Sequence, residues 1–215
     1  MTVGAVVLPD DAGQALADAS GRVAVRRIVE SAWAGGALPI IVVVSDGQGQ
    51  VAASLEGSPA RVIEAGGAQG AAAARRGIRA ARQAVRETSA FLLWPGRMAW
   101  IDPETVTSLI EAHGRGGRAA MRPLRATQAG WPVLVTAAGV DKLFRDGRAT
   151  LEEAIAALEM STVELGDPGS VLGMEVALED LPAYAGPPEP VGGPPPDWGA
   201  AAAETPDPEV APGSE

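Results

Sequence analysis

The chain has no cysteine, one histidine and no long apolar run. Without cysteine the protein cannot form disulfides, thiolate zinc sites or iron–sulfur clusters, and it has no cysteine nucleophile. A single histidine excludes metal centres built from several histidines. No apolar stretch approaches the ~18 residues of a membrane span, and no signal-peptide pattern is evident at the N-terminus. We therefore expect a cytoplasmic protein that does not bind a membrane.

Basic residues are also scarce. Among 215 residues there are 17 Lys and Arg against 27 Asp and Glu, which gives a net charge of −10. This balance argues against broad binding to the phosphate backbone of nucleic acid, so we expect no nucleic-acid partner. Hydrophobic residues make up 47% of the chain. The chain can therefore bury a core, and its length suits one α/β domain with a tail.

The composition changes at Pro182. Residues 182–215 contain 10 of the 18 prolines and six acidic residues but no Lys or Arg, which leaves residues 1–181 with a net charge of −4. Proline removes backbone donors and this segment has little apolar area to bury, so we expect a disordered, proline-rich acidic tail after the domain. Its Tyr184 and Trp198 offer contacts to the body or to a partner. One hypothesis is accordingly a protein-interaction module that works through its tail.

Strand-like and helix-like segments alternate along residues 1–181. This alternation, with apolar strands, predicts a three-layer α/β/α domain with a mostly parallel sheet. The expected strands cover residues 2–8, 38–44, 60–64, 90–93, 118–122, 132–135, 162–165 and 171–176. The expected helices cover residues 22–34, 47–56, 70–88, 102–113, 137–144 and 150–159.

Ligands of such sheets bind beyond the carboxyl ends of the strands. Here those ends are residues 8–14, 44–47, 64–70, 94–98 and 166–170. The first of them, from Pro9 to Gln14, contains Asp10, Asp11 and one glycine but no base. Phosphate-binding loops need several glycines and usually a Lys or Arg, so this loop would repel a triphosphate unless a divalent metal bound the carboxylates.

Two further segments carry residues suited to binding. Trp94, Arg97 and Trp100 follow the fourth expected strand and predict either a stacking pocket or packing under a helix. The helix over residues 70–88 carries arginines at spacings of four, three and four, which places them in one stripe. This stripe is either a solvated helix face or a surface for phosphate, a carboxylate-rich partner or the acidic tail; it comprises Arg75, Arg79, Arg82 and Arg86.

The order of several short motifs resembles the MobA-like NTP transferase family over about residues 3–181. The matching segments are a first strand, a Ser-Gly-Arg turn, a helix ending in Gly-Gly, a Gly-initiated helix, a Pro-Glu-Thr-Val helix, a Gly-Trp-Pro-Val segment and an Asp-Pro-Gly turn. They lie at Gly4–Leu8, Ser20–Arg22, Ile28–Gly36, Gln69–Ile78, Asp102–Val106, Ala129–Leu134 and Asp167–Gly169. The resemblance implies a nucleotidyltransferase fold of the GT-A, Rossmann-like type, and a Mg²⁺-assisted transfer of a nucleotidyl group.

The chain departs from this family at the functional positions. Pro9-Asp10-Asp11 stands where the family has Ala-Ala-Gly, and the Arg and Lys of the glycine-rich loop are absent. Arg97 occupies the position of a metal-binding Asp, and Met174 and Val176 occupy those of the closing pair of Asp residues. Trp131 replaces a histidine. Because catalysis depends on such preorganised charges, we expect no catalytic residues.

The leading hypothesis is a catalytically degenerate homologue that acts in binding, scaffolding or regulation, without a resident cofactor. Its ligand would be a nucleotide or a phosphorylated small molecule, and the expected cleft contains Asp10, Asp11, Gly13, Arg22, Gly70, Arg97 and Trp131. The alternative is an active enzyme that transfers NMP from an NTP to a phosphorylated acceptor such as molybdopterin. In that case Mg²⁺ would lie on Asp10, Asp11 and Asp167.

Overall fold

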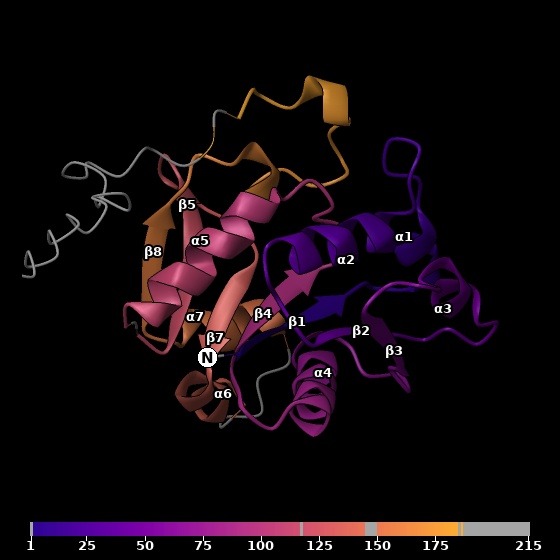
Figure 1. Cartoon of the computed structure of the whole chain (residues 1–215), viewed down its shortest axis with the longest axis horizontal. Coiled ribbons are helices and arrows are strands. Elements are labelled where there is room, and N and C mark those ends of the chain that lie inside the picture. The colour runs from indigo at the N-terminus through magenta and orange to yellow at the C-terminus, as the bar shows by residue number, and fades with distance from the viewer. Residues whose placement is uncertain (1, 117, 145–149, 185, 187–215) are drawn as a thin grey trace, which may run out of the picture.

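One eight-stranded sheet forms the centre of the computed structural model, which describes residues 2–116, 118–144, 150–184 and 186 (Figure 1). The strand order is β3-β2-β1-β4-β7-β5-β6, and β8 pairs with β5. The strands are β1 (Thr2–Leu8), β2 (Ile40–Val44), β3 (Ala60–Glu64), β4 (Thr88–Pro95), β5 (Ala120–Arg125), β6 (Gln128–Ala129), β7 (Val133–Thr136) and β8 (Met160–Glu164).

Most neighbouring strands run in the same direction. The pairs β1–β2, β2–β3, β1–β4 and β5–β8 are parallel, while β7 is antiparallel to both β4 and β5. Two antiparallel steps restore the original direction, so β5 and β8 run parallel to β1. The predicted mostly parallel α/β fold is confirmed, with β7 as an antiparallel insertion.

Helices cover both faces of the sheet. In Figure 1, α2 and α5 lie on one face, and α4 and α6 lie on the other. The helices are α1 (Ala12–Leu16), α2 (Ala24–Ala34), α3 (Gln50–Ser54), α4 (Gly70–Ala84), α5 (Pro103–Gly114), α6 (Ala137–Leu143) and α7 (Leu151–Ala156), with short 3-10 turns η1 (Pro168–Ser170) and η2 (Leu178–Asp180).

Local sequence explains where several helices begin. Asp102 caps α5 by accepting a hydrogen bond from the Glu104 N–H at 2.8 Å, and Pro103 follows at the first helical position. This is the pattern that satisfies the free N–H groups of a helix start. Thr150 and Glu153 form a complete capping box at α7. These caps fix the starts of α5 and α7 independently of packing.

Several element bounds differ from the expectations, β6 was not expected, and three differences affect the site. Residues 12–16 form the short helix α1 because Asp11 caps it, accepting from the Gln14 N–H at 2.7 Å. Helix α4 ends at Ala84 rather than residue 88, since Val85 is in an extended conformation. Residues 171–176 form no strand; the Met174 N–H instead donates to the Arg97 carbonyl at 2.9 Å, in a loop after η1.

The predicted tail lies largely outside the described residues. Of its aromatic residues, Tyr184 is half-buried and Trp198 lies beyond the described part of the chain. The boundary at 181/182 and the disorder of the tail stay predictions. Over the ranges that the structure describes, none of the helices combines the length and apolar character needed to cross a membrane.

Helix α4 packs against the sheet at Gly77. A β-carbon there would overlap Cγ1 of Val6 and lie 2.9 Å from Cγ2 of Val43, so only glycine allows α4 to approach β1 and β2 this closely. The contact makes Gly77 a packing requirement of the whole domain, because β1 and β2 lie at the centre of the parallel part of the sheet.

We predict that Gly77→Ala lowers the free energy of unfolding by about 1–3 kcal/mol, the usual cost of overpacking a core. Helix propensity alone would favour alanine by about 1 kcal/mol, so a loss of stability isolates the steric effect. Urea unfolding measures it. The control is Gly47→Ala, where an added β-carbon meets nothing within 4 Å and stability should be unchanged. A stabilised Gly77→Ala protein would contradict the packing explanation.

Candidate functional site

A hollow of about 180 Å³ lies where β1, β2, β3 and β4 end. Of the expected cleft residues, Asp10 and Gly70 lie in it. Its described lining contains two acids and no base: Leu8, Pro9, Asp10, Val44, Ser45, Ala65, Gly67, Ala68, Gln69, Gly70, Ala73, Pro95, Leu151 and Glu152. The described residues of this hollow therefore offer hydrogen-bonding groups but no positive charge for phosphates.

A second hollow of about 270 Å³ brings Arg97 and Trp131 together, as expected. Glu152 lines both hollows, so the two adjoin at the start of α7. The second lining consists of Arg97, Arg122, Trp131, Glu152, Ile155, Ala156, Leu158 and Met160. Sequence reasoning missed Arg122 and Glu152; a charged residue within a buried strand was the available signal for Arg122.

The first strand-end loop is closed on itself through Gln14. The Gln14 side chain accepts from the Asp10 N–H at 3.0 Å and donates to the Asp10 carboxylate at 2.9 Å. Pro9 packs against Gly96, where a β-carbon would lie 2.6 Å from the Pro9 Cα. Two backbone N–H groups of this loop are thus already used, since the Asp10 N–H is bound to Gln14 and the Gln14 N–H is bound to Asp11.

Three of the expected cleft residues have other tasks. Asp11 caps α1 and Gly13 lies within that helix. Arg22 forms an ion pair with Glu30 of α2, which also pairs with Arg26 at 3.2 Å. None of these three residues lines either hollow.

The two arginines of the second hollow are held by neighbouring groups. Arg97 lies 3.9 Å from the Glu175 carboxylate, and both side chains are about half exposed. The guanidinium of Arg122 stacks over Trp131 at 5.6 Å and donates to the Gly130 carbonyl at 2.9 Å. Burial lowers the pKa of Arg122. The pair Arg97 and Arg122 is the positive charge that this end of the cleft presents.

Two tryptophans expected near the cleft are structural instead. Trp94 is fully buried, and its indole N–H donates to the Met98 carbonyl at 2.8 Å. The indole N–H of Trp100 donates to the Gly173 carbonyl at 3.0 Å. Both tryptophans therefore have a packing role rather than forming a ligand pocket. The indole of Trp94 is hydrogen-bonded to the loop that follows β4, and the indole of Trp100 is hydrogen-bonded to the loop after η1.

Asp167 is a buried structural carboxylate. It accepts from the Thr105 hydroxyl at 2.7 Å and from the N–H groups of Gly169 at 2.8 Å and Asp102 at 3.1 Å. These bonds tie the loop after β8 to the start of α5. Burial raises the pKa of the Asp167 carboxyl above its ordinary value, although the three hydrogen bonds oppose this shift.

Within the described ranges, no group of three or more His, Asp or Glu side chains lies close enough together to hold a metal ion. The geometry thus gives no support to Mg²⁺ on Asp10, Asp11 and Asp167, which remains an untested hypothesis.

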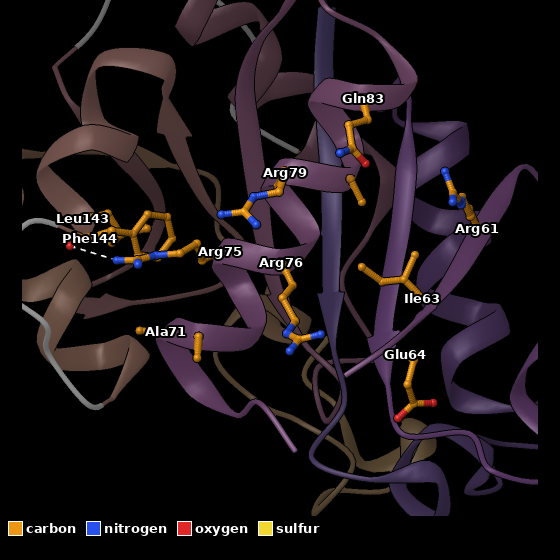
Figure 2. A pocket seen from close by; sticks show the side chains of 12 residues that line it. Arg61, Ile63, Glu64, Ala71, Arg75, Arg76, Arg79, Gln83, Leu143 and Phe144 are labelled. Carbon is orange, nitrogen blue, oxygen red and sulfur yellow. Dashed lines mark hydrogen bonds between the residues drawn. The ribbon is translucent and has the colours of Figure 1, made fainter. Parts of the chain in front are cut away.

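A larger hollow, of about 680 Å³, lies away from the strand ends, along α4 (Figure 2). Arg75 and Arg79 line both this hollow and a neighbouring one of about 610 Å³, which Arg82 and Arg86 also line. The predicted arginine stripe therefore faces one continuous depression rather than bulk solvent alone.

The strand order and the cleft at the strand ends define the fold of the nucleotidyltransferases. A nucleotidyl transferase from Methanothermobacter matches with a TM-score of 0.60 and 17% identity, covering 76% of this chain and 87% of that one. A 4-diphosphocytidyl-2C-methyl-D-erythritol synthase from Anaerococcus prevotii matches with a TM-score of 0.63 and 12% identity, covering 80% and 92%. Molybdopterin-guanine dinucleotide biosynthesis protein A from Archaeoglobus fulgidus matches with a TM-score of 0.54 and 17% identity, covering 76% of this chain and 83% of that one.

The family assignment follows from the sequence itself. Residues 12–163 match the model of the MobA-like NTP transferase domain. The chain therefore belongs to the MobA-like NTP transferase domain family, as its motifs suggested. A search of curated proteins finds no match to this chain.

We predict a pH-dependent stability contribution from Asp167. Because its pKa is raised in the folded state, the folded protein binds this proton more tightly than the unfolded chain does between the ordinary and the raised pKa. Its contribution to the free energy of unfolding should fall as pH rises through that window. We therefore expect the free energy of unfolding of the wild type, minus that of Asp167→Asn, to decrease as pH rises through this window. Above the window the difference should be constant. Urea unfolding at a series of pH values measures it.

Glu111→Gln, which removes an exposed carboxylate of α5, is the control, and its difference from wild type in the free energy of unfolding is subtracted at each pH. A pH-independent difference for Asp167→Asn would contradict the raised pKa.

Proposed function

We propose that this chain is a MobA-like domain that has lost nucleotidyl transfer and acts by binding a phosphorylated small molecule, in a scaffolding or regulatory role. The observation that carries the proposal is the closed loop after β1. The N–H groups of Asp10 and Gln14 are bound by the Gln14 side chain and by Asp11, and the loop contains no Lys or Arg. A nucleotidyl transfer site needs unpaired donors and cations aimed at the phosphates.

The residues at the other strand ends support the same proposal. Arg97 stands at the end of β4, where a carboxylate would be needed to hold a metal, and its charge is opposed by Glu175. One preorganised donor contributes about 2.7–4 kcal/mol to lowering a reaction barrier, so the loss of several would remove most of the catalysis. Arg97 and Arg122 remain able to hold a phosphate group without a metal.

Glu175 gives this phosphate site a defined competitor. Burial alone would raise its pKa, but the Gly173 N–H and Arg97 lower it, so the carboxylate is charged at neutral pH. A phosphorylated ligand would displace Glu175 from Arg97. Trp131, which is nearly buried beside Arg122, would supply an aromatic surface for the rest of the ligand.

An active enzyme that transfers NMP to a phosphorylated acceptor such as molybdopterin is the competing function. Nucleotide binding by a relative favours it: one similar structure is a CMP:2-keto-3-deoxy-manno-octonic acid synthetase complexed with CTP, with a TM-score of 0.56 and 13% identity. Mg²⁺ would then have to recruit Asp10 and Asp11 away from Gln14 and the α1 cap.

Calorimetry with CTP, GTP and ATP, each with and without Mg²⁺, together with a pyrophosphate assay in the presence of molybdopterin as the acceptor, separates the two functions. We expect that Mg²⁺ does not strengthen the binding of any of the three nucleotides and that no pyrophosphate is released. Mg²⁺-dependent binding with pyrophosphate release would instead establish the active enzyme. In that case Asp10→Ala/Asp11→Ala should abolish the Mg²⁺ effect, while Asp141→Ala, an exposed acid on α6, should leave it intact.

A further inference from the structure

Two adjoining hollows run along the outer side of α4 and share Arg75, Arg79, Gln83 and Phe144. One extends toward β3 and the other toward α6. Figure 2 shows the guanidinium groups that project into the first of them. We call the combined depression the arginine groove; its basic residues are Arg61, Arg75, Arg76, Arg79, Arg82 and Arg86.

Among the described residues, no carboxylate pairs with an arginine of the arginine groove. Over the described part of the chain, every ion pair within 4.0 Å involves Arg22, Arg26, Arg97 or Arg118, and none involves a groove arginine. Only two acids line the groove, and one of them, Glu64, already accepts from the Gly66 N–H at 3.2 Å. The groove is therefore a strongly positive surface on a chain that is acidic as a whole.

The shape of the groove suits an extended chain of negative charges rather than one compact ion. From Arg75 to Ala84, where α4 ends, the helix rises about 14 Å at 1.5 Å per residue, and Arg86 lies two residues beyond that end. The aromatic ring of Phe144 lies 4.8 Å below the Arg75 guanidinium, and Ile78 and Val140 add apolar floor. An extended acidic peptide with some apolar character matches this combination.

We propose that the arginine groove binds the acidic C-terminal segment of the same chain. Within that segment Glu204-Thr-Pro-Asp-Pro-Glu209 places three carboxylates in six residues. In a polyproline-type conformation at about 3.1 Å per residue these residues span about 16 Å, close to the length of the stripe. Pro206 and Pro208 restrict the backbone and so reduce the entropy lost on binding.

The covalent connection allows this contact. Gly186 is the last described residue before the segment, and it lies beside Glu104 at the start of α5. Helix α5 covers the face of the sheet opposite to α4 (Figure 1). The eighteen residues from 186 to 204 reach up to about 60 Å when extended, and a domain of this size is about 40 Å across. The segment can therefore pass around the sheet edge to α4.

Nucleic acid would also be attracted to the six arginines. However, the net charge of −10 repels a polyanion, and the tethered carboxylates compete with it for the arginines. A tethered segment is present at an effective concentration of millimolar order, whereas a separate partner is not. The chain's own segment is thus the favoured occupant, and any other acidic protein would have to displace it.

Paramagnetic labelling tests the proposal in the full-length chain. Because the protein has no cysteine, Ser214→Cys creates a unique site for a nitroxide label. We expect the amide NMR signals of Arg79 and Gln83 to lose intensity relative to the reduced, diamagnetic label. Raising salt to 1 M, where the Debye length is about 3 Å, should restore them.

Charge variants give the controls. Arg79→Glu/Arg86→Glu should abolish the loss of intensity, and Arg115→Glu, an exposed arginine at the end of α5, should not. Glu204→Gln/Asp207→Asn/Glu209→Gln should also abolish it and leaves the folded domain unaltered. The proposal is overturned if α4 signals keep their intensity, or if the loss persists in these two multiple variants. A mixture of nitroxide-labelled protein and separate isotope-enriched protein tests binding between molecules. If the α4 signals lose intensity only in this mixture, the segment binds a second molecule and the proposal is overturned.

Discussion

The burial of β1 between β2 and β4 is the constraint on which the rest of the structure depends. Both edges of this strand are hydrogen-bonded, and its residues from Val3 to Val7 are buried. Backbone groups in such a position must be paired, so the strand cannot shift without breaking both ladders. The glycine at position 77 adds a third constraint, because it seats α4 directly on Val6.

This rigid centre determines where the functional loops emerge. The Leu8 carbonyl accepts from the Gly96 N–H at 3.0 Å, which ties the end of β1 to the end of β4. The loop that follows Leu8 must then turn over Gly96, where Gln14 closes it. The same geometry that would aim a glycine-rich loop at a phosphate here holds a loop in which the N–H groups of Asp10 and Gln14 and the carboxylates of Asp10 and Asp11 are hydrogen-bonded internally.

Charge is distributed in opposite ways at the two depressions. In the strand-end cleft several charged groups have an internal partner: Asp10 is bound to Gln14, Arg97 pairs with Glu175 and Arg122 stacks over Trp131. In the arginine groove, no guanidinium has a carboxylate partner among the described residues. Electrostatic attraction for an anion is therefore stronger on α4 than at the strand ends, although family members are expected to use the strand ends.

Much of this arrangement could be predicted from residue patterns. Apolar runs predicted β1 and β2, the Asp-Pro-Glu-Thr start predicted α5, and motif order predicted the family. The antiparallel β7 was not predictable in the same way, because an apolar run of four residues specifies burial but not direction. Residues 171–176 have strand-like composition, yet no strand forms there, since the Met174 N–H bonds to Arg97 and the N–H groups of Val171, Leu172 and Val176 bond to nearby turn carbonyls.

By itself the sequence determined the alternation of most strands and helices, the family, and the concentration of proline and acidic residues after Pro182. Only the tertiary structure decided which charges meet. Asp167 reaches Thr105 across 62 positions, and Arg75 reaches the Phe144 carbonyl across 69. The physical reason is that local patterns report the conformation of neighbouring residues, whereas hydrogen bonds and ion pairs between distant residues depend on how the sheet and helices pack.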